Sequence, residues 1–141
     1  MNADVEMTGT RRTSGEDREE ESIHFRQPGK IRSVAGRIHI MCDETDPEDG
    51  SISRYHMILT GDEACVRKKG PSETDLTFRA GETTKGMIRT PYGLIALDIR
   101  TGELSVTEKD GGVRALIAYE LCDGDAVLSW NRLSIDVTEV R

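Results

Sequence analysis

Hydrophobic and polar residues alternate with a period of two along most of the chain. The alternation is clearest at residues 37–42, 54–59, 76–78, 113–121 and 132–138. Such a pattern is typical of a β-strand that buries one face and exposes the other. A sustained helical period is found nowhere in the sequence, so the pattern predicts an all-β fold.

Turn-forming residues separate these strands at short intervals. Asp110-Gly111 and Asp123-Gly124 are strong hairpin signals, because glycine accepts the positive φ that tight hairpin turns need. Gln27-Pro28-Gly29 and the segment 46–50 also have turn composition. Many short strands joined by hairpins indicate an antiparallel meander, and a meander avoids exposed edges when it closes into a barrel.

The segment from Gly9 to Ser22 departs from this alternation because it is polar and rich in charge. It lies between a first strand, marked by Val5 and Met7, and a second, marked by Ile23 and Phe25. We therefore expect a long mobile loop at residues 9–22 within a single domain at 1–141.

Composition narrows the partners that the protein can have. The chain has 141 residues, of which 35% are hydrophobic and 32% charged, and its formal net charge is −7. An acidic protein repels phosphate backbones, so we expect no nucleic-acid partner. The one short basic run, Arg67-Lys68-Lys69, is interpreted as a solvated strand end.

Targeting signals and cysteine usage point to a reducing compartment. The sequence contains neither a signal peptide nor an apolar segment long enough to span a bilayer, so we expect a cytoplasmic protein with no membrane partner. Cys42, Cys65 and Cys122 have no metal-binding spacing and are expected to be free thiols. Cys42 shares parity with Ile38 and Ile40, which favours a buried core position.

Several motifs follow one another in a distinctive order. Thr90-Pro91-Tyr92-Gly93 is the most distinctive of them; the others are Val66–Gly70, Leu76–Gly81, Asp110–Gly112, Tyr119–Leu121 and Asn131–Val137. This order resembles the YwiB-like family of uncharacterised bacterial proteins. The resemblance implies a single antiparallel barrel of the calycin (lipocalin-like) type, with about eight to ten strands. It implies no particular activity.

Arg89-Thr90-Pro91-Tyr92-Gly93 has two interpretations. Proline and glycine can shape the start of a barrel strand, where Tyr92 would bury its ring. Alternatively, Arg89, Thr90 and Tyr92 present polar groups at the barrel mouth, where ligands often bind.

Two other clusters contain residue types that can bind metal ions. The acidic run 43–50 lacks the ligand spacing of an EF-hand loop and contains a proline, so it is interpreted as a solvated turn. His24, His39 and His56 lie on successive predicted strands and face outward. They form either an incidental exterior row or, if the register allows, a zinc site. We predict no metal and no cofactor.

Function is predicted only in outline. Weak candidates for ligand binding are Glu44, Arg67, Arg89, Thr90, Tyr92 and Tyr119. Arg67 could enter the barrel and pair with Glu44. The first hypothesis is a non-enzymatic module that binds a small ligand in or at the mouth of the barrel, or a partner on its surface. The alternatives are a hydrolase or isomerase that uses Tyr92 and Glu44, and a structural or regulatory module that contacts partners through the expected loop at residues 9–22. The sequence leaves the oligomeric state open.

Overall fold

The computed structural model describes residues 1–14 and 20–140. Within these residues the chain forms ten antiparallel strands that close into a barrel, as predicted. The strands are β1 (Asn2–Thr13), β2 (Glu20–Val34), β3 (Arg37–Thr45), β4 (Ile52–Leu59), β5 (Glu63–Lys69), β6 (Glu73–Arg79), β7 (Thr83–Thr90), β8 (Gly93–Lys109), β9 (Gly112–Asp123) and β10 (Ala126–Glu139). In this part of the chain no helix is long and apolar enough to cross a membrane.

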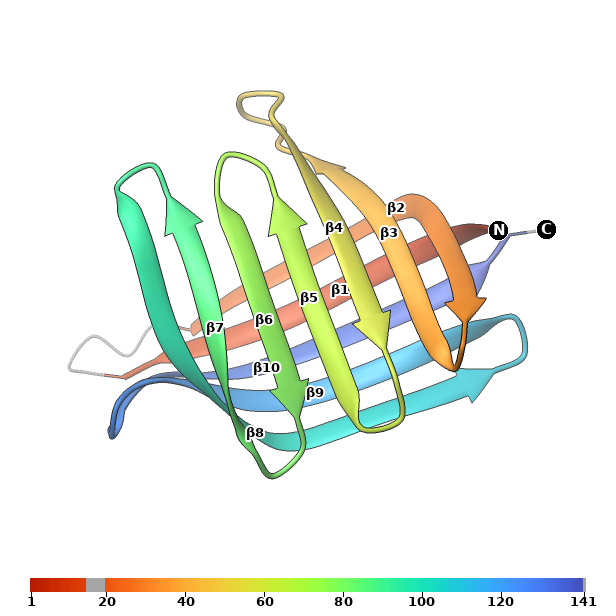
Figure 1. The fold of residues 1–141 in the computed structure, drawn as a ribbon. Coiled ribbons are helices and arrows are strands. Elements are labelled where there is room, and N and C mark those ends of the chain that lie inside the picture. The colour runs from red at the N-terminus through yellow and green to blue at the C-terminus, as the bar shows by residue number, and fades with distance from the viewer. Residues whose placement is uncertain (15–19, 141) are drawn as a thin grey trace.

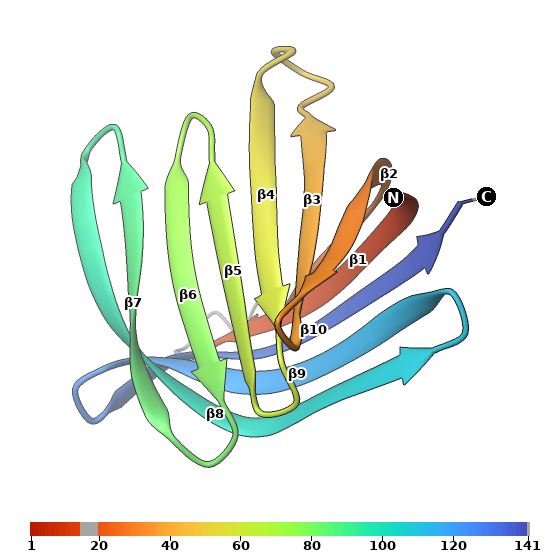
Figure 2. The same cartoon turned by 45° about the vertical axis from the view of Figure 1, so that its right-hand side comes forward.

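The barrel is flattened into two sheets that cross each other (Figure 1). One sheet contains β1, β10 and β9, and the other contains β3 to β7 (Figure 2). Two long strands belong to both sheets. β2 pairs with β1 over residues 20–30 and with β3 over 29–34. β8 pairs with β7 over 93–100 and with β9 over 98–109. These two strands therefore form the corners of the barrel.

The corner in β2 lies at Pro28-Gly29, where the sequence predicted a turn. A Cβ atom at Gly29 would lie 2.4 Å from the carbonyl oxygen of Met41 on β3. Only glycine allows β2 to approach β3 so closely at the point where it changes its pairing partner. The predicted turn is thus a bend inside a continuous strand.

The hairpin predictions are confirmed at two turns. β8 and β9 are joined at Asp110-Gly111, and β9 and β10 are joined just after Asp123, with positive φ at Gly111 and Gly124. The segment 9–22 differs from the prediction of a loop. Residues 9–13 belong to β1 and residues 20–22 belong to β2. Residues 15–19 of the predicted loop lie outside the described residues.

The predicted alternation gives the core correctly. Ile38, Ile40 and Cys42 are buried on β3, and alternate residues are likewise buried on β4, β9 and β10. Inward residues on β1, β10, β9 and β8 lie opposite one another in cross-strand rows. Three successive rows are apolar apart from one glycine and the end of β8: Val5–Val137–Val113–Glu108, Met7–Ile135–Ala115–Val106 and Gly9–Leu133–Ile117–Leu104.

Candidate functional site

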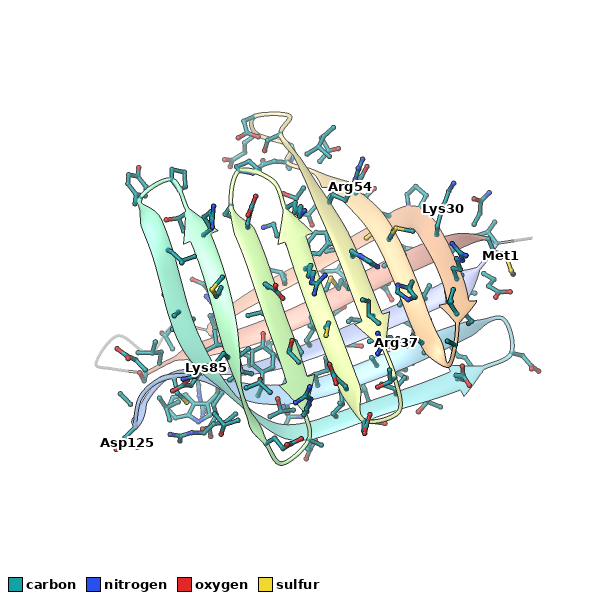
Figure 3. All side chains as sticks on the ribbon, in the orientation of Figure 1. Met1, Lys30, Arg37, Arg54, Lys85 and Asp125 are labelled. Carbon is teal, nitrogen blue, oxygen red and sulfur yellow. The ribbon has the colours of Figure 1, made fainter. Side chains whose placement is uncertain are left out.

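The fourth inward row is polar. Arg11 on β1 lies opposite Asn131 on β10, Asn131 lies opposite Tyr119 on β9, and Tyr119 lies opposite Thr101 on β8. We call these four residues the polar row. The pairing registers place it nearer the β9–β10 turn, where Figure 3 labels Asp125, than the end of the barrel with Met1.

Irregular pairing on two strands flanks the polar row. The register of β8 shifts between Thr101 and Glu103, and that of β10 shifts between Val127 and Ser129. β-Bulges of this kind are frequent at barrel rims and beside functional sites, because they change the direction of a side chain and bend the strand.

Asn131 is the centre of the hydrogen bonds in the polar row. Its side chain is buried, and its Nδ2 donates to Oγ of Ser129 at 3.0 Å and to the carbonyl oxygen of Tyr119 at 3.5 Å. Its Oδ1 accepts a hydrogen bond from Nε of Arg11 at 3.3 Å. Two donor contacts on one side of the amide orient its oxygen toward Arg11.

Thr101 is the second buried polar residue of the row, with 3% of its surface exposed. Its hydroxyl has no hydrogen-bond partner among the described residues. Its backbone, in contrast, is paired with the β6–β7 turn: Gly81 N donates to Thr101 O at 2.8 Å, and Thr101 N donates to Glu82 O at 3.2 Å. An unpaired buried hydroxyl costs free energy, so this position is not optimised for stability.

Tyr119 joins the polar row to the core. Its ring packs on Phe78 with 4.6 Å between ring centroids. Burial raises the pKa of the Tyr119 phenol, and the charge of Arg11 partly opposes that rise. The hydroxyl therefore remains protonated at neutral pH and is available as a hydrogen-bond donor.

An open cleft of about 780 Å³ extends from the polar row to the β6–β7 turn and the first residue of β7, Thr83. Its volume lies in the range of small-molecule sites. Four arginines border it: Arg11, Arg12, Arg100 and Arg132. Three glutamates also border it: Glu20, Glu82 and Glu120. Among these described residues arginine is in excess by one, whereas the whole chain has a net charge of −7.

Two of the predicted site residues lie together on the outer face of the barrel. Arg67 and Arg89 border a small hollow of about 130 Å³ over β5, β6 and β7. Arg67 lies 3.7 Å from Asp75, with more than half of each side chain exposed. The predicted pairing of Arg67 with Glu44 inside the barrel is therefore wrong.

The other predicted site residues are dispersed. Glu44 lies near the end of β3, whereas Thr90 and Tyr92 form the β7–β8 turn. Thr90 Oγ1 donates to Gly93 O and accepts from Tyr92 N, so this residue stabilises the turn. Tyr92 is 99% exposed, which contradicts the predicted burial of its ring. Glu44 and Tyr92 are not brought together, and Tyr119 alone of the predicted set lies at the cleft.

Two of the three histidines lie together, and the third lies apart from them. His39 Nδ1 and His56 Nε2 lie 3.1 Å apart on the outer face, and both side chains are half-buried. His24 instead pairs with Glu6 at 3.0 Å. Burial, His39 and Arg67 all lower the pKa of His56. Among the described residues no group of three or more histidine, cysteine or acidic side chains is placed to hold a metal ion.

The acidic run 43–50 contains the β3–β4 turn. Asp46 Oδ1 accepts from Glu48 N, and Asp49 Oδ1 accepts from Ser51 N, each at 2.8 Å. These carboxylates therefore stabilise the turn by bonding to nearby backbone N–H groups. Cys42 is buried as predicted, and burial raises the pKa of its thiol to about 11.

Sequence reasoning missed three residues of the polar row: Arg11, Thr101 and Asn131. The polar composition of its segment predicts a loop at Arg11, although Arg11 continues the inward parity of Val5 and Met7. Extending that parity would have identified it. Asn131 could have been found in the same way, as the polar residue on the inward parity of Leu133 and Ile135.

The fold and the polar row define a small antiparallel β-barrel with a polar cleft at one end of its interior. The family model described as "Domain of unknown function (DUF1934)" matches residues 5–135, and the chain belongs to this family. The crystal structure of the ywiB protein from Bacillus subtilis is similar, with a TM-score of 0.78 and 16% sequence identity over 99% of this chain and 94% of that chain. This likeness concerns the fold and confirms the YwiB-like resemblance. No curated protein matches the sequence.

Proposed function

We propose that this barrel is a binding module for a small polar ligand, which it holds in the cleft beside the polar row. The observation that carries the proposal is the change of chemistry within one set of inward rows. Three rows pack the core, and the fourth presents Arg11, Asn131, Tyr119 and Thr101. Polar groups on inward positions cost desolvation free energy, which a bound ligand can offset with hydrogen bonds.

The cleft supports binding rather than a filled barrel end. Its volume of about 780 Å³ can take a small organic molecule, and its lining includes Thr101, whose buried hydroxyl has no hydrogen-bond partner among the described residues. A cluster of buried apolar side chains forms the core, so the open end of the barrel is where a ligand would fit.

Native mass spectrometry of the intact protein tests the proposal. The protein is incubated with a deproteinised cell extract and its native mass is compared with its denatured mass. We expect a reproducible non-covalent adduct on the wild type. The adduct should be lost in Asn131→Leu, because this change removes the central amide of the polar row while keeping a side chain of similar size.

The matched control is Arg114→Gln, which changes an exposed residue on the outward face of β9. It should keep the adduct. An unmodified native mass, or an equal adduct on a folded Asn131→Leu protein, would contradict the proposed function.

A further inference from the structure

The ligand class can be narrowed by comparing the arginines at the cleft. Arg12 and Arg100 face outward and are engaged there. The guanidinium of Arg12 lies 5.1 Å from the ring centroid of Trp130. Arg100 lies 3.8 Å from Glu120 and donates to the carbonyl oxygen of Gly124 at 3.2 Å. These two arginines already have partners on the surface.

Arg11 differs from both because it belongs to the inward polar row, whereas Arg132, the fourth arginine at the cleft, lies on the outward parity of β10. Its Nε donates to Asn131 Oδ1 at 3.3 Å, and no carboxylate of the described residues forms an ion pair with it. A guanidinium group has five N–H donors in one plane. With Nε held by Asn131, the edge formed by Nη1 and Nη2 is left for another acceptor.

Asn131 fixes this arrangement from a buried position. Ser129 Oγ and the Tyr119 carbonyl oxygen hold its amide nitrogen, so its oxygen stays directed at Arg11. Asn131 is therefore a positioning residue for Arg11. An arginine held in this way loses less conformational entropy when it binds a planar anion.

We propose that the cleft binds a small organic oxyanion, whose carboxylate or phosphate group is received by the Nη1 and Nη2 edge of Arg11. The uncharged part of the ligand lies against Tyr119, which offers a ring and a protonated hydroxyl. Paired N–H donors of arginine match the two oxygens of a carboxylate or phosphate. This inference rests on the proposed function, because it specifies the ligand of the same cleft.

Glu21 is the carboxylate of this protein that competes with such a ligand for Arg11. It lies opposite Arg11 in the β1–β2 register and borders an adjoining hollow of about 210 Å³ together with Arg11, Tyr119 and Asn131. Its negative charge opposes a second anion nearby. We therefore expect Glu21→Gln to tighten the binding of an oxyanion and to leave the binding of a neutral analogue unchanged.

Titration of the full chain with three matched probes tests the inference. Benzoate, phenyl phosphate and benzamide share a ring and differ in the group offered to Arg11, and binding is followed by two-dimensional NMR. We expect at least one of the two anions to bind about tenfold more tightly than benzamide, since hydrogen bonds to charged groups are the stronger class. The preferred anion distinguishes a carboxylate ligand from a phosphate ligand.

Three variants test whether the preference for the anion depends on Arg11. Arg11→Gln should abolish the preference for the anion and leave the benzamide affinity unchanged, whereas Arg114→Gln should keep the preference. Asn131→Ala should reduce the preference without unfolding the protein, because it releases the guanidinium. A role of Asn131 in folding alone would not alter the ratio between the two probes.

Two results would overturn the inference. Equal binding of benzamide and both anions, unaffected by Arg11→Gln, would show that the cleft takes neutral ligands, and the proposed function would stand. If none of the probes perturbs resonances of the cleft, the oxyanion assignment fails. The proposed function is then decided separately by the adduct in the native mass spectrum.

Discussion

Two rows on the same strands carry opposite chemistry. Val5, Val137 and Val113 are fully buried at one end of β1, β10 and β9, whereas Arg11, Asn131 and Tyr119 occupy the same parity at the other end. The valine row explains stability, because it removes apolar surface from water. The polar row does not, since its buried groups lose hydration. A barrel that needed only stability would have continued the apolar rows, and departures from local consistency are expected at functional sites.

The largest expected effect is at the apolar end. Ile135 is fully buried in the second row, and Ile135→Ala removes apolar contacts and leaves a cavity. We expect it to lower the free energy of unfolding by about 2–5 kcal/mol, measured by chemical denaturation. Binding at the cleft should persist in the fraction that remains folded.

Leu116→Ala is the matched control for this change. Leu116 lies on the outer face of the same sheet and is 44% exposed, so its truncation should cost much less. Equal losses from the two truncations would mean that the interior of this end is not the packed core.

The second expected effect has the opposite sign and lies in the polar row. Thr101→Val keeps the side-chain shape and removes a buried hydroxyl without a described partner. We expect the free energy of unfolding to rise by about 1 kcal/mol, because the desolvation cost of that group disappears. Thr107→Val, at an exposed position of the same strand, should change stability little.

The same variant links stability to function. If the hydroxyl is kept for a ligand, Thr101→Val should weaken binding while it stabilises the barrel. A loss of stability in Thr101→Val would instead show that the hydroxyl has a structural partner, and the contrast between the two rows would lose its support.

Sequence predicted the packed rows well and the polar row poorly, for a physical reason. Burial of Ile38, Ile40 and Cys42 follows from alternation within one strand, which is local information. The polar row depends on the register of four strands, and a shift of one residue would turn each side chain to the other face. Register is determined by tertiary pairing, as is the corner at Gly29, where a strand changes its partner.

Composition also misled the prediction at the first hairpin. Gly9 to Ser22 is polar enough to be read as a loop, yet its ends pair as β1 and β2. Pairing with strands on both sides holds residues 9–12 in place despite their polar side chains. Motif resemblance and chemical type are the grounds for Tyr119 as well as for Arg67 and Tyr92, and neither specifies the inward or outward face.

The smallest expected effect separates the polar row from the polar pair on the outer face, His39 and His56. The lowered pKa of His56 means that the unfolded chain takes up this proton near the ordinary value of 6.5, while the folded chain takes it up at a lower pH. Between these values the unfolded state binds more protons, so the contribution of His56 to stability is complete above pH 6.5 and is lost as the pH falls below it.

Denaturation midpoints measured on either side of this window should decrease toward acid in the wild type and decrease less in His56→Gln. Asn131→Leu is the control and should keep the wild-type slope, because it replaces a side chain that does not titrate. An unchanged slope in His56→Gln, or a flattened slope in Asn131→Leu, would assign the acid sensitivity to the interior and reverse the distinction between the two polar clusters.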